Sequence, residues 1–597
     1  MITAADVHAA VGAQTVRALL RRNAEEYGDL PALTGADGST LTWRRLHDRV
    51  RAVASGLRAL GLRRGERMLI GMSSRPEHWI ADFAAVQLGA IPCTTYATLS
   101  PEQIHQIALH SAATVVVLEG PAELRRWRQA LAAMPGLRAV VVVEGAGDGH
   151  VPFAELAATP PATEPLEPVG LDDPVTMIYT SGTTGDPKGV VLTHGNVLYQ
   201  CALQELIQPV PPHPRTIAYL PLAHVAERVL GMYLPVYSAG HVTICPDPAQ
   251  LPATLTAVRP HGFFGVPRVW EKFAAAVQHE LSRLEGDLRT AVDRARGLAA
   301  EAYRIRADGT PLPGELAAAL ADADKLVLRP LRERLGLAEA LRLGSGSAPI
   351  PPEVLEFFGS LGMTITEVWG LSETTGAATT TYPDRYRAGT VGLPVPGMQV
   401  RAAADGEIEV RGPLVFPGYL QPDGRVEPAV DAEGWLPTGD LGTFDDDGML
   451  RITGRKKEII ITSSGKNIAP SRVESLLRRH PLIGHVAAVG DRRPYLTALV
   501  ALDEEAAPVW AAAHGLPATD FAELAADPRI HEEVSAAVRE ANEALSRPEQ
   551  IKAFHLVDRP WTPDGGELTP TLKLRRAVVE QRYAAEIDGL YAKGRSS

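Results

Sequence analysis

One short run constrains the fold of this chain more than any other part of the sequence. From Tyr179 to Val190 it reads Tyr-Thr-Ser-Gly-Thr-Thr-Gly-Asp-Pro-Lys-Gly-Val. Apolar residues flank the run at 175–179 and 190–192, so we expect a loop between two strands. Glycines let backbone N–H groups approach an anion closely, the hydroxyls donate hydrogen bonds, and Lys188 adds a positive charge. The run therefore predicts a loop that binds the phosphates of ATP.

The loop differs from the Walker A motif of motor proteins and GTPases. In that motif a Gly-Lys pair is followed by Ser or Thr and opens a helix. Here Lys188 precedes Gly189, and apolar residues follow. The difference indicates ATP chemistry on another fold.

Composition excludes several classes of protein. The chain has 597 residues, and at about 100 to 200 residues per domain this length predicts three or four folding units. A net charge of −12 argues against nucleic acid as a partner. The three cysteines, Cys93, Cys201 and Cys245, have neither disulfide nor zinc-site spacing.

We expect a cytoplasmic protein, because the N-terminus lacks the basic and apolar regions of a signal peptide. No apolar run approaches the roughly 18 to 20 residues of a membrane span. The sequence leaves open whether the protein touches a membrane peripherally and what its oligomeric state is.

The order of elements predicts an α/β fold. Short apolar segments that read as strands alternate with helical patterns in the first third of the chain, at 67–71, 113–119 and 138–144. Between 395 and 451 the pattern changes to short strands with Gly, Pro and Asp turns, which indicates a β subdomain. Residues 274–339 should be helical with a break at 308–313, and 520–545 should be helical within a smaller α+β unit.

Four further motifs contain residue types that suit a nucleotide site. They are Thr366-Glu-Val-Trp-Gly-Leu-Ser-Glu-Thr-Thr375, Gly434-Trp-Leu-Pro-Thr-Gly-Asp440, Arg455-Lys-Lys-Glu-Ile-Ile-Ile-Thr-Ser-Ser-Gly-Lys-Asn-Ile-Ala-Pro470, and Gly566-Glu-Leu-Thr-Pro-Thr-Leu-Lys-Leu-Arg-Arg576. A carboxylate such as Asp440 can accept two hydrogen bonds from a ribose diol. Magnesium typically takes one or two carboxylates and completes its shell with water and phosphate oxygens, which suits Glu373.

Together with the loop, these motifs resemble the adenylate-forming (AMP-binding) superfamily, which includes acyl-CoA synthetases, luciferases and the adenylation domains of peptide synthetases. The resemblance covers nearly the whole chain. Segments 219–228, 265–272 and 344–349, and the Leu-Thr-Pro-Thr-Leu-Lys that ends at Lys573, resemble the long-chain fatty acyl-CoA synthetase branch. Three positions depart from the usual pattern: Trp369 replaces Tyr, Ser372 replaces Thr, and Leu572 precedes the lysine where many members have Gly.

The resemblance implies two domains. A large multi-subdomain α/β N-terminal domain would span residues 1–454 and include the β subdomain at about 395–451. A small mobile α+β C-terminal domain would span 455–597 and rotate about Lys457 between two half-reactions.

The resemblance also implies a role for individual residues. Trp369 would stack on adenine, Ser372 would contact a phosphate, and Glu373 would ligate magnesium. Asp440 would bind the ribose, and Arg455 would add a ribose or phosphate contact. The implied catalytic residues are Lys573, His224, Glu373 and Lys188. The implied cofactor-binding residues are Thr180, Ser181, Gly182, Thr183, Thr184, Gly185, Lys188, Gly344, Gly346, Ser347, Trp369, Gly370, Ser372, Asp440, Arg455, Lys457 and Gly465.

The activity implied by the resemblance is ATP-dependent activation of a long-chain fatty acid to acyl-AMP with release of pyrophosphate, followed by transfer to coenzyme A. Lys573 would serve the first step, and Gly465 would line the thiol tunnel in the second. Two alternatives stay open: a ligase that loads a carrier protein, and an inactive nucleotide-binding scaffold. The acyl chain length is not given by the sequence, because side chains brought together by folding set it.

Overall fold

The computed structural model describes residues 2–147, 149–162, 166–181, 187–307, 309–516, 520–569 and 572–593. Contacts within the chain divide it into two compact units. The first comprises Met1–Arg401, Glu409–Thr438 and Phe444–Arg451, and the second comprises Ala402–Ile408, Gly439–Thr443 and Ile452–Ser597. Among the described residues no helix is both long enough and apolar enough to cross a membrane.

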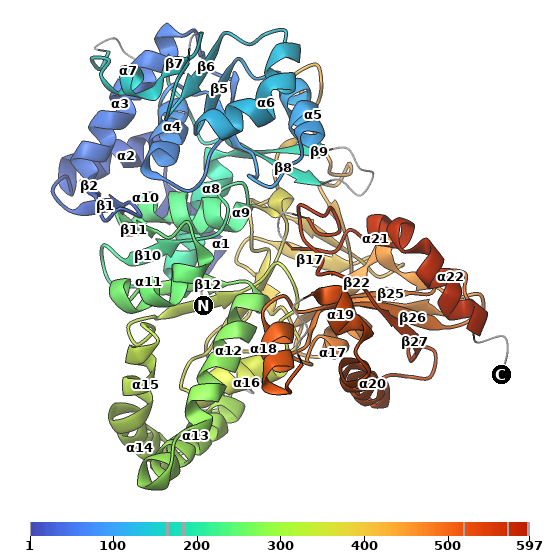
Figure 1. Cartoon of the computed structure of the whole chain (residues 1–597). Coiled ribbons are helices and arrows are strands. Elements are labelled where there is room, and N and C mark those ends of the chain that lie inside the picture. Colours follow the sequence, from blue (N-terminus) through green and yellow to red (C-terminus); the bar gives the residue numbers. More distant parts are fainter. Residues whose placement is uncertain are drawn as a thin grey trace. The chain divides into compact units, whose positions relative to one another are not determined.

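The first unit begins with helices and a five-stranded sheet of order β4-β3-β5-β6-β7, in which the neighbours that pair are parallel. The strands are β3 (Arg67–Gly71), β4 (Ile91–Thr94), β5 (Val115–Leu118), β6 (Ala139–Val142) and β7 (Val151–Pro152), and the helices are α1 (Ala4–Val11), α2 (Val16–Glu26), α3 (Trp43–Ala59), α4 (Pro76–Gln87), α5 (Pro101–Ser111), α6 (Pro121–Ala133) and α7 (Phe153–Ala157). Helices α5 and α6 cover one face of the sheet (Figure 1). The predicted alternation of strands and helices is confirmed.

Two more sheets complete the α/β part of this unit. One has the order β10-β11-β1-β2 and the other β12-β13-β14-β15-β16. Their strands are β1 (Pro31–Thr34), β2 (Thr40–Thr42), β10 (Arg215–Ala218), β11 (His241–Ile244), β12 (Gly262–Gly265), β13 (Arg342–Ser345), β14 (Thr366–Trp369), β15 (Thr379–Thr380) and β16 (Leu393–Pro394). The associated helices are α8 (His194–Ile207), α9 (Val225–Glu227), α10 (Leu234–Ser238), α11 (Leu251–Val258) and α16 (Pro352–Ser360), with a π-helical stretch at Arg228–Tyr233.

The region 274–339 is helical, as the sequence predicts. It contains α12 (Pro267–Ser282), α13 (Gly286–Ala307), α14 (Gly314–Ala323), a π-helical stretch at Asp324–Leu328 and α15 (Arg329–Arg334). The expected break lies between the end of α13 and the start of α14. Helices α13 and α14 and the stretch before α15 pack around a small core of Ala295, Ala299 and Leu328 (Figure 1).

Two antiparallel strands flank the predicted phosphate loop, which confirms the predicted strand–loop–strand arrangement. Strands β8 (Pro174–Ser181) and β9 (Pro187–Thr193) pair from Pro174 and Thr193 to Ser181 and Pro187. Strand β19 (Gly418–Leu420) pairs with the other edge of β9, and β20 (Val426–Glu427) follows it. A second four-stranded sheet contains β17 (Gln399–Ala402), β18 (Glu407–Arg411), β21 (Leu436–Phe444) and β22 (Leu450–Arg455).

The second unit contains a three-stranded sheet with helices on both faces (Figure 1). The strands are β25 (Ile483–Val489), β26 (Leu496–Leu502) and β27 (Ile551–Leu556), and a short hairpin of β23 (Ile460–Ile461) and β24 (Asn467–Ile468) precedes them. Helices α17 (Pro470–Leu477), α18 (Ala506–Ala513), α19 (Phe521–Ala526) and α20 (Pro528–Glu543) share one core, and α21 (Arg576–Arg582) and α22 (Ala584–Lys593) share the other.

The alternation of side chains along β26 explains the two cores. Ala498 and Val500 lie in the first core, whereas Leu499 and Ala501 lie in the second. The predicted helical segment 520–545 supplies α19 and α20, and it buries Leu524, Ile530 and Val534 against the first face. This segment is therefore part of the core of the α+β unit.

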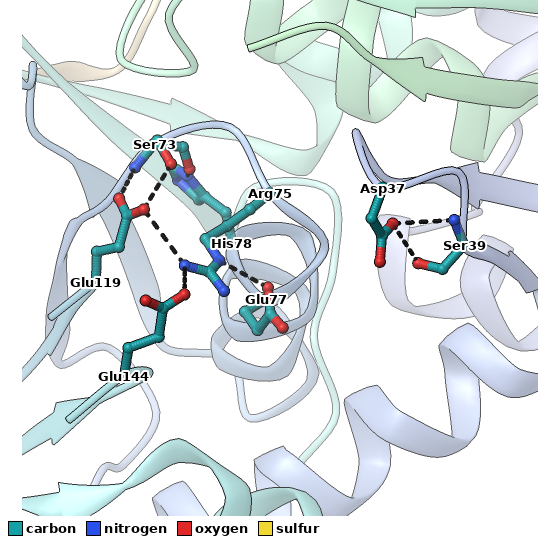
Figure 2. A network of polar contacts seen from close by, with 8 residues as sticks. All are labelled: Asp37, Ser39, Ser73, Arg75, Glu77, His78, Glu119 and Glu144. Atoms are coloured by element: carbon teal, nitrogen blue, oxygen red, sulfur yellow. Dashed lines mark hydrogen bonds and ion pairs between the residues drawn. The ribbon is translucent and has the colours of Figure 1, made fainter. Parts of the chain in front are cut away.

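A network of charged side chains fastens the carboxyl ends of β3 and β5 to the start of α4 (Figure 2). Arg75 bonds Glu77 at 2.8 Å, Glu119 at 3.3 Å and Glu144 at 2.7 Å. Glu119 also accepts hydrogen bonds from the backbone N–H and the hydroxyl of Ser73, at 2.8 and 3.0 Å. One guanidinium thus serves three carboxylates from three different segments.

Replacing the centre of this network should destabilise the first unit. In Arg75→Ala, Glu77 and Glu119 lose a partner while they remain partly shielded from water, so we expect a loss of about 1 to 3 kcal/mol in the free energy of unfolding. Urea unfolding followed by tryptophan fluorescence measures this loss. Arg21→Ala is the control, since the Arg21–Glu25 pair is 3.9 Å apart and each side chain is 68% exposed. Equal stability of the two variants would contradict the prediction.

Candidate functional site

The predicted phosphate-loop lysine stands on strand β9. Lys188 is exposed and pairs in register with Thr180 on β8. Its Nζ lies 4.9 Å from the centre of the Tyr419 ring. The loop residues Gly182, Thr183, Thr184 and Gly185 lie outside the described residues, and so does the side chain of Ser181.

A neighbouring pair holds the strand that leads into the loop. The Tyr179 hydroxyl lies 2.8 Å from Nδ1 of His110 on α5, and Tyr179 is buried. This contact attaches the end of β8 to the helical layer over the first sheet. The sequence did not indicate His110, because nothing near it in the chain resembles a site.

The second motif forms a tight turn after β14. Trp369 ends the strand, and 8% of its surface is exposed. Gly370 is required, because a Cβ there would collide with the carbonyl of Gly376. Ser372 and Glu373 follow in a single 3₁₀ turn, Ser372–Thr374.

The glycines of segment 344–349 lie beside this turn. Strand β13 pairs with β14 in parallel, and Gly344 is opposite Thr366. A Cβ on Gly346 would lie 2.6 Å from Cγ2 of Val368 and 2.9 Å from its carbonyl oxygen, so the two backbones approach closely only because this residue is glycine. Ser347 follows at φ 71°. The structure therefore brings Gly344, Gly346 and Ser347 next to the second motif.

The surroundings of Glu373 suit magnesium, which does not need a cage of several protein ligands. It is half-buried, and Oε1 accepts a hydrogen bond of 2.8 Å from the Tyr419 hydroxyl. Among the described residues no three His, Cys, Asp or Glu side chains gather as a metal site. Mg²⁺ typically binds through one or two carboxylates together with water and phosphate oxygens, so a single carboxylate fits this ion.

His224 caps the short helix α9. Its Nδ1 accepts a hydrogen bond of 3.2 Å from the backbone N–H of Ala226, so the neutral ring carries its proton on Nε2. The helix continues into the π-helical stretch that begins at Arg228. Single π-helical turns are common at functional sites.

The first residue of the π-helical stretch, Arg228, forms a fully buried ion pair. Arg228 is 1% exposed and donates to Asp82, which is 0% exposed. Arg228 also donates to the Thr94 hydroxyl at 3.0 Å, and that hydroxyl lies 2.8 Å from Nε2 of His78. Burial lowers the pKa of His78 to about 3, so this ring stays neutral. Sequence analysis missed Asp82 and His78, because they join the motif only through folding.

Glu227 is a buried carboxyl beside the same pair. Its Oε2 accepts a hydrogen bond of 2.9 Å from the backbone N–H of Leu220, and 4% of its surface is exposed. Burial raises the pKa of Glu227 to about 8. At neutral pH the side chain is therefore protonated. Its hydrogen bond links Leu220, four residues before His224, to the residue directly before the π-helical stretch.

In the second unit Asp440 and Arg455 lie together. Arg455 Nε is 2.8 Å from Asp440 Oδ1, and Asp440 is buried at 4% exposure. The next residue, Lys456, bonds Asp405 at 2.6 Å and Glu407 at 2.7 Å. Lys457, the predicted hinge residue, thus follows a residue that two carboxylates hold in place. Sequence analysis did not single out Lys456.

Gly465 sits in a turn between β23 and β24. Its N–H donates to the Thr462 carbonyl at 2.8 Å, and its φ is 78°. A Cβ at this position would meet no other atom within 4 Å. Glycine is therefore favoured here because of the left-handed backbone conformation, and not because a side chain would collide with its neighbours.

Lys573 lies in a hairpin whose base is tightly held. Its backbone N–H donates to the Thr569 hydroxyl at 3.0 Å, and its carbonyl accepts from the Thr569 N–H at 2.7 Å. Glu567, fully buried, bonds both Arg559 and Arg582. The lysine side chain is exposed.

Leu572, directly before this lysine, has a left-handed backbone. Its φ is 59°, in the left-handed region, and 51% of its surface is exposed. A residue with a Cβ is destabilised there by roughly 1 to 2 kcal/mol, whereas glycine is not.

Comparison with known proteins places the chain in a family. The model of the AMP-binding enzyme family matches residues 20–420, and that of the AMP-binding enzyme C-terminal domain matches residues 457–595. The chain belongs to the AMP-binding enzymes, and it is an adenylate-forming enzyme that activates a carboxylic acid with ATP.

Two relatives are similar over most of their length. The long-chain-fatty-acid–CoA ligase FadD15 of Mycobacterium tuberculosis is 37% identical over 559 residues, which cover 92% of this chain and 91% of that protein. The long-chain-fatty-acid–CoA ligase ACSBG2 of Xenopus laevis is 30% identical over 622 residues, which cover 97% and 84%.

Solved structures share the fold. The adenylation domain of a carboxylate reductase from Mycobacterium chelonae superposes with a TM-score of 0.75 at 22% identity, covering 98% of this chain and 93% of that one. The corresponding domain from Segniliparus rugosus, in complex with AMP and a co-purified carboxylic acid, gives a TM-score of 0.73 at 22% identity and covers 99% and 96%. The expected fold, a large α/β adenylation domain with a small C-terminal domain, is confirmed.

The protonated state of Glu227 predicts a pH-dependent stability. In the unfolded chain this carboxyl ionises near pH 4.5, whereas in the fold it ionises near pH 8. Between these values the folded state keeps the proton and the unfolded state does not. The stabilisation from the protonated carboxyl is complete below pH 4.5. Above it, the free energy of unfolding falls by roughly 1 kcal/mol per pH unit as the pH rises towards 8. Glu227→Gln does not titrate, and its stability relative to the parent should therefore increase from pH 5 to pH 8.

Urea unfolding at four pH values measures this difference. Glu25→Gln, at a carboxylate that is 68% exposed, is the matched control and should track the parent at every pH. A constant offset between Glu227→Gln and the parent would show that the carboxyl is ionised in the fold.

Proposed function

We propose that this enzyme is a long-chain fatty acid–CoA ligase. It would join a fatty acid to the α-phosphate of ATP, release pyrophosphate, and pass the acyl group from AMP to the thiol of coenzyme A. The observation that supports the chemistry best is that Lys188, on strand β9, and Glu373, in the second motif, both contact Tyr419. Support for the long acyl chain comes from the names of FadD15 and ACSBG2.

The first step brings two anions together. A carboxylate oxygen has to approach the α-phosphate, and the repulsion between them grows as water is excluded. Lys188 in the first unit and Lys573 in the second are the cations that we assign to this task. Magnesium, held by Glu373, would neutralise part of the phosphate charge. Without a protein nucleophile, the step depends on positioning and on charge stabilisation.

The nucleoside would be bound by two groups of residues. Trp369 would stack on adenine, with Gly344, Gly346 and Ser347 beside it and Ser372 at a phosphate. The Asp440 carboxylate would accept hydrogen bonds from both ribose hydroxyls. Its ion pair with Arg455 fixes the orientation of the carboxylate before the nucleotide arrives. His224, oriented by its cap, would lie near the carboxylate that is activated.

The second step would use other residues of the second unit. We assign the hinge to Lys457 and the approach of the coenzyme A thiol to the backbone at Gly465. The turn at Gly465 has a left-handed backbone and open space where a side chain would be, which suits a segment that a pantetheine chain passes.

A panel of acids tests the proposed reaction. Pyrophosphate release is measured with carboxylic acids from acetate to oleate, with and without coenzyme A, and the product is identified by mass spectrometry. We expect acyl-CoA as product, with a maximum at long chains. Acyl-AMP that accumulates in the presence of coenzyme A would indicate a ligase that loads a carrier protein. The absence of pyrophosphate release with every acid would contradict the proposal.

Lys573→Ala should separate the two half-reactions. We expect acyl-AMP formation to fall by about a hundredfold or more, the loss that follows removal of one transition-state donor. Conversion of supplied acyl-AMP and coenzyme A to thioester should persist. Leu572→Gly is the matched control: glycine adopts a φ of 59° without strain, so both half-reactions should stay near the parent rates. An equal fall of both half-reactions in Lys573→Ala would refute the assignment.

A further inference from the structure

Residues 413–420, which we call the tie segment, connect three parts of the first unit. Asn196 of α8 donates to the carbonyls of Pro413 and Val415 at 2.8 and 3.2 Å. The Thr375 hydroxyl donates to the Leu414 carbonyl at 2.8 Å. At its end the segment becomes β19, which pairs with β9. The tie segment therefore fixes the second motif relative to the strand of Lys188.

Two contacts of the tie segment converge on Glu373. The Phe416 N–H donates to the Glu373 carbonyl at 2.9 Å, and the Tyr419 hydroxyl donates to Glu373 Oε1 at 2.8 Å. The rings of Phe416 and Tyr419 meet edge to face with centroids 4.8 Å apart. Backbone and side chain of Glu373 are thus held by the same short segment.

The Tyr419 ring also faces the loop lysine. Lys188 Nζ stands 4.9 Å from the ring centroid, a distance at which the ring face attracts a cation. Tyr419 is opposite Val190 in the β19–β9 pairing, two residues from Lys188. One phenol therefore touches both the cation of the loop and the carboxylate of the second motif.

This arrangement keeps two opposite charges from neutralising each other. In the part of the chain that the structure describes, Lys188 and Glu373 form no ion pair with one another, although both contact Tyr419. An ion pair between them would occupy the groups that a phosphate and a metal ion need. The phenol hydroxyl donates to Glu373 Oε1, while the face of the same ring lies towards Lys188.

We infer that Tyr419 is a positioning residue for the metal–nucleotide complex, which holds the Glu373 carboxylate in one orientation and keeps Lys188 apart from it. This inference rests on the proposed function only for the binding of ATP with a divalent cation, and not for the identity of the acid. Sequence motifs did not indicate Tyr419, and no other role for its hydroxyl follows from its contacts.

Metal binding in the absence of acid and coenzyme A tests the inference directly. The affinity of Mn²⁺ for the full-length protein with saturating ATP is measured by electron paramagnetic resonance, and ATP binding without metal is measured by calorimetry. Tyr419→Phe keeps the ring over Lys188 and removes the hydroxyl. Loss of a partner that orients a metal ligand typically weakens metal binding about 10- to 100-fold. We expect such a loss, with metal-free ATP binding within about twofold of the parent.

Two further variants sharpen the test. Tyr237→Phe removes a tyrosine hydroxyl that donates to the Ala10 carbonyl at 3.1 Å, away from the site, and should bind Mn²⁺ like the parent. Tyr419→Phe added to Glu373→Gln should weaken Mn²⁺ binding no further than Glu373→Gln alone, because both changes act on one contact.

The outcomes separate this inference from the proposed reaction. Unchanged Mn²⁺ affinity in Tyr419→Phe overturns the inference, and so does an equal loss in Tyr237→Phe or an additive loss in the double variant. Failure of the parent to bind Mn²⁺ and ATP together also overturns it. If the parent activates no acid while Tyr419→Phe still loses Mn²⁺ affinity, the positioning role holds and the proposed reaction fails.

Discussion

The pairing of β9 with β8 on one side and β19 on the other determines where the charged groups of the first unit stand. Side chains alternate along a strand, so a shift of one residue in this register would turn Lys188 to the opposite face. Gly189 permits the close pairing: a Cβ there would lie 3.0 Å from Met177 Sδ and 3.3 Å from Leu420 Cβ. Met177, Val191 and Leu420 in turn belong to the core that α5 and α6 cover. Register, and with it the position of the lysine, is therefore fixed by burial.

Basic side chains near the candidate site residues have two different kinds of partner, carboxylates and an aromatic ring. Arg228 and Lys456 are paired with carboxylates, Arg228 in the interior and Lys456 in the second unit, and each fastens a segment that precedes or follows a candidate site residue. Lys188 instead rests on an aromatic ring. A carboxylate carries a full negative charge and attracts a cation more strongly than the face of an aromatic ring does. The phosphate role that we propose for Lys188 is compatible with this weaker partner, because a phosphate would have less to displace.

The sequence predicted what local pattern controls and missed what folding brings together. The strand–loop–strand arrangement around Lys188, the α/β layering and the helices at 520–545 follow from periodicity and turn residues within a few positions. Tyr419 stands 46 residues from Glu373, and Asp82 stands 146 residues from Arg228. Nothing in a single sequence pairs such positions. Leu572 is intermediate: its place before Lys573 was visible as a departure from the usual motif, but its left-handed backbone was not.

The hairpin of Lys573 shows how a strained residue can persist next to an exposed lysine. A left-handed leucine costs about 1 to 2 kcal/mol, so contacts elsewhere in the hairpin must exceed that amount. The backbone bonds between Thr569 and Lys573, the Arg575 N–H on the Glu567 carbonyl, and the two arginines on the Glu567 side chain supply such contacts. They act on the base of the hairpin and leave the lysine side chain exposed. The backbone of Lys573 is thus held in place, as the role that we propose for this lysine in adenylation requires.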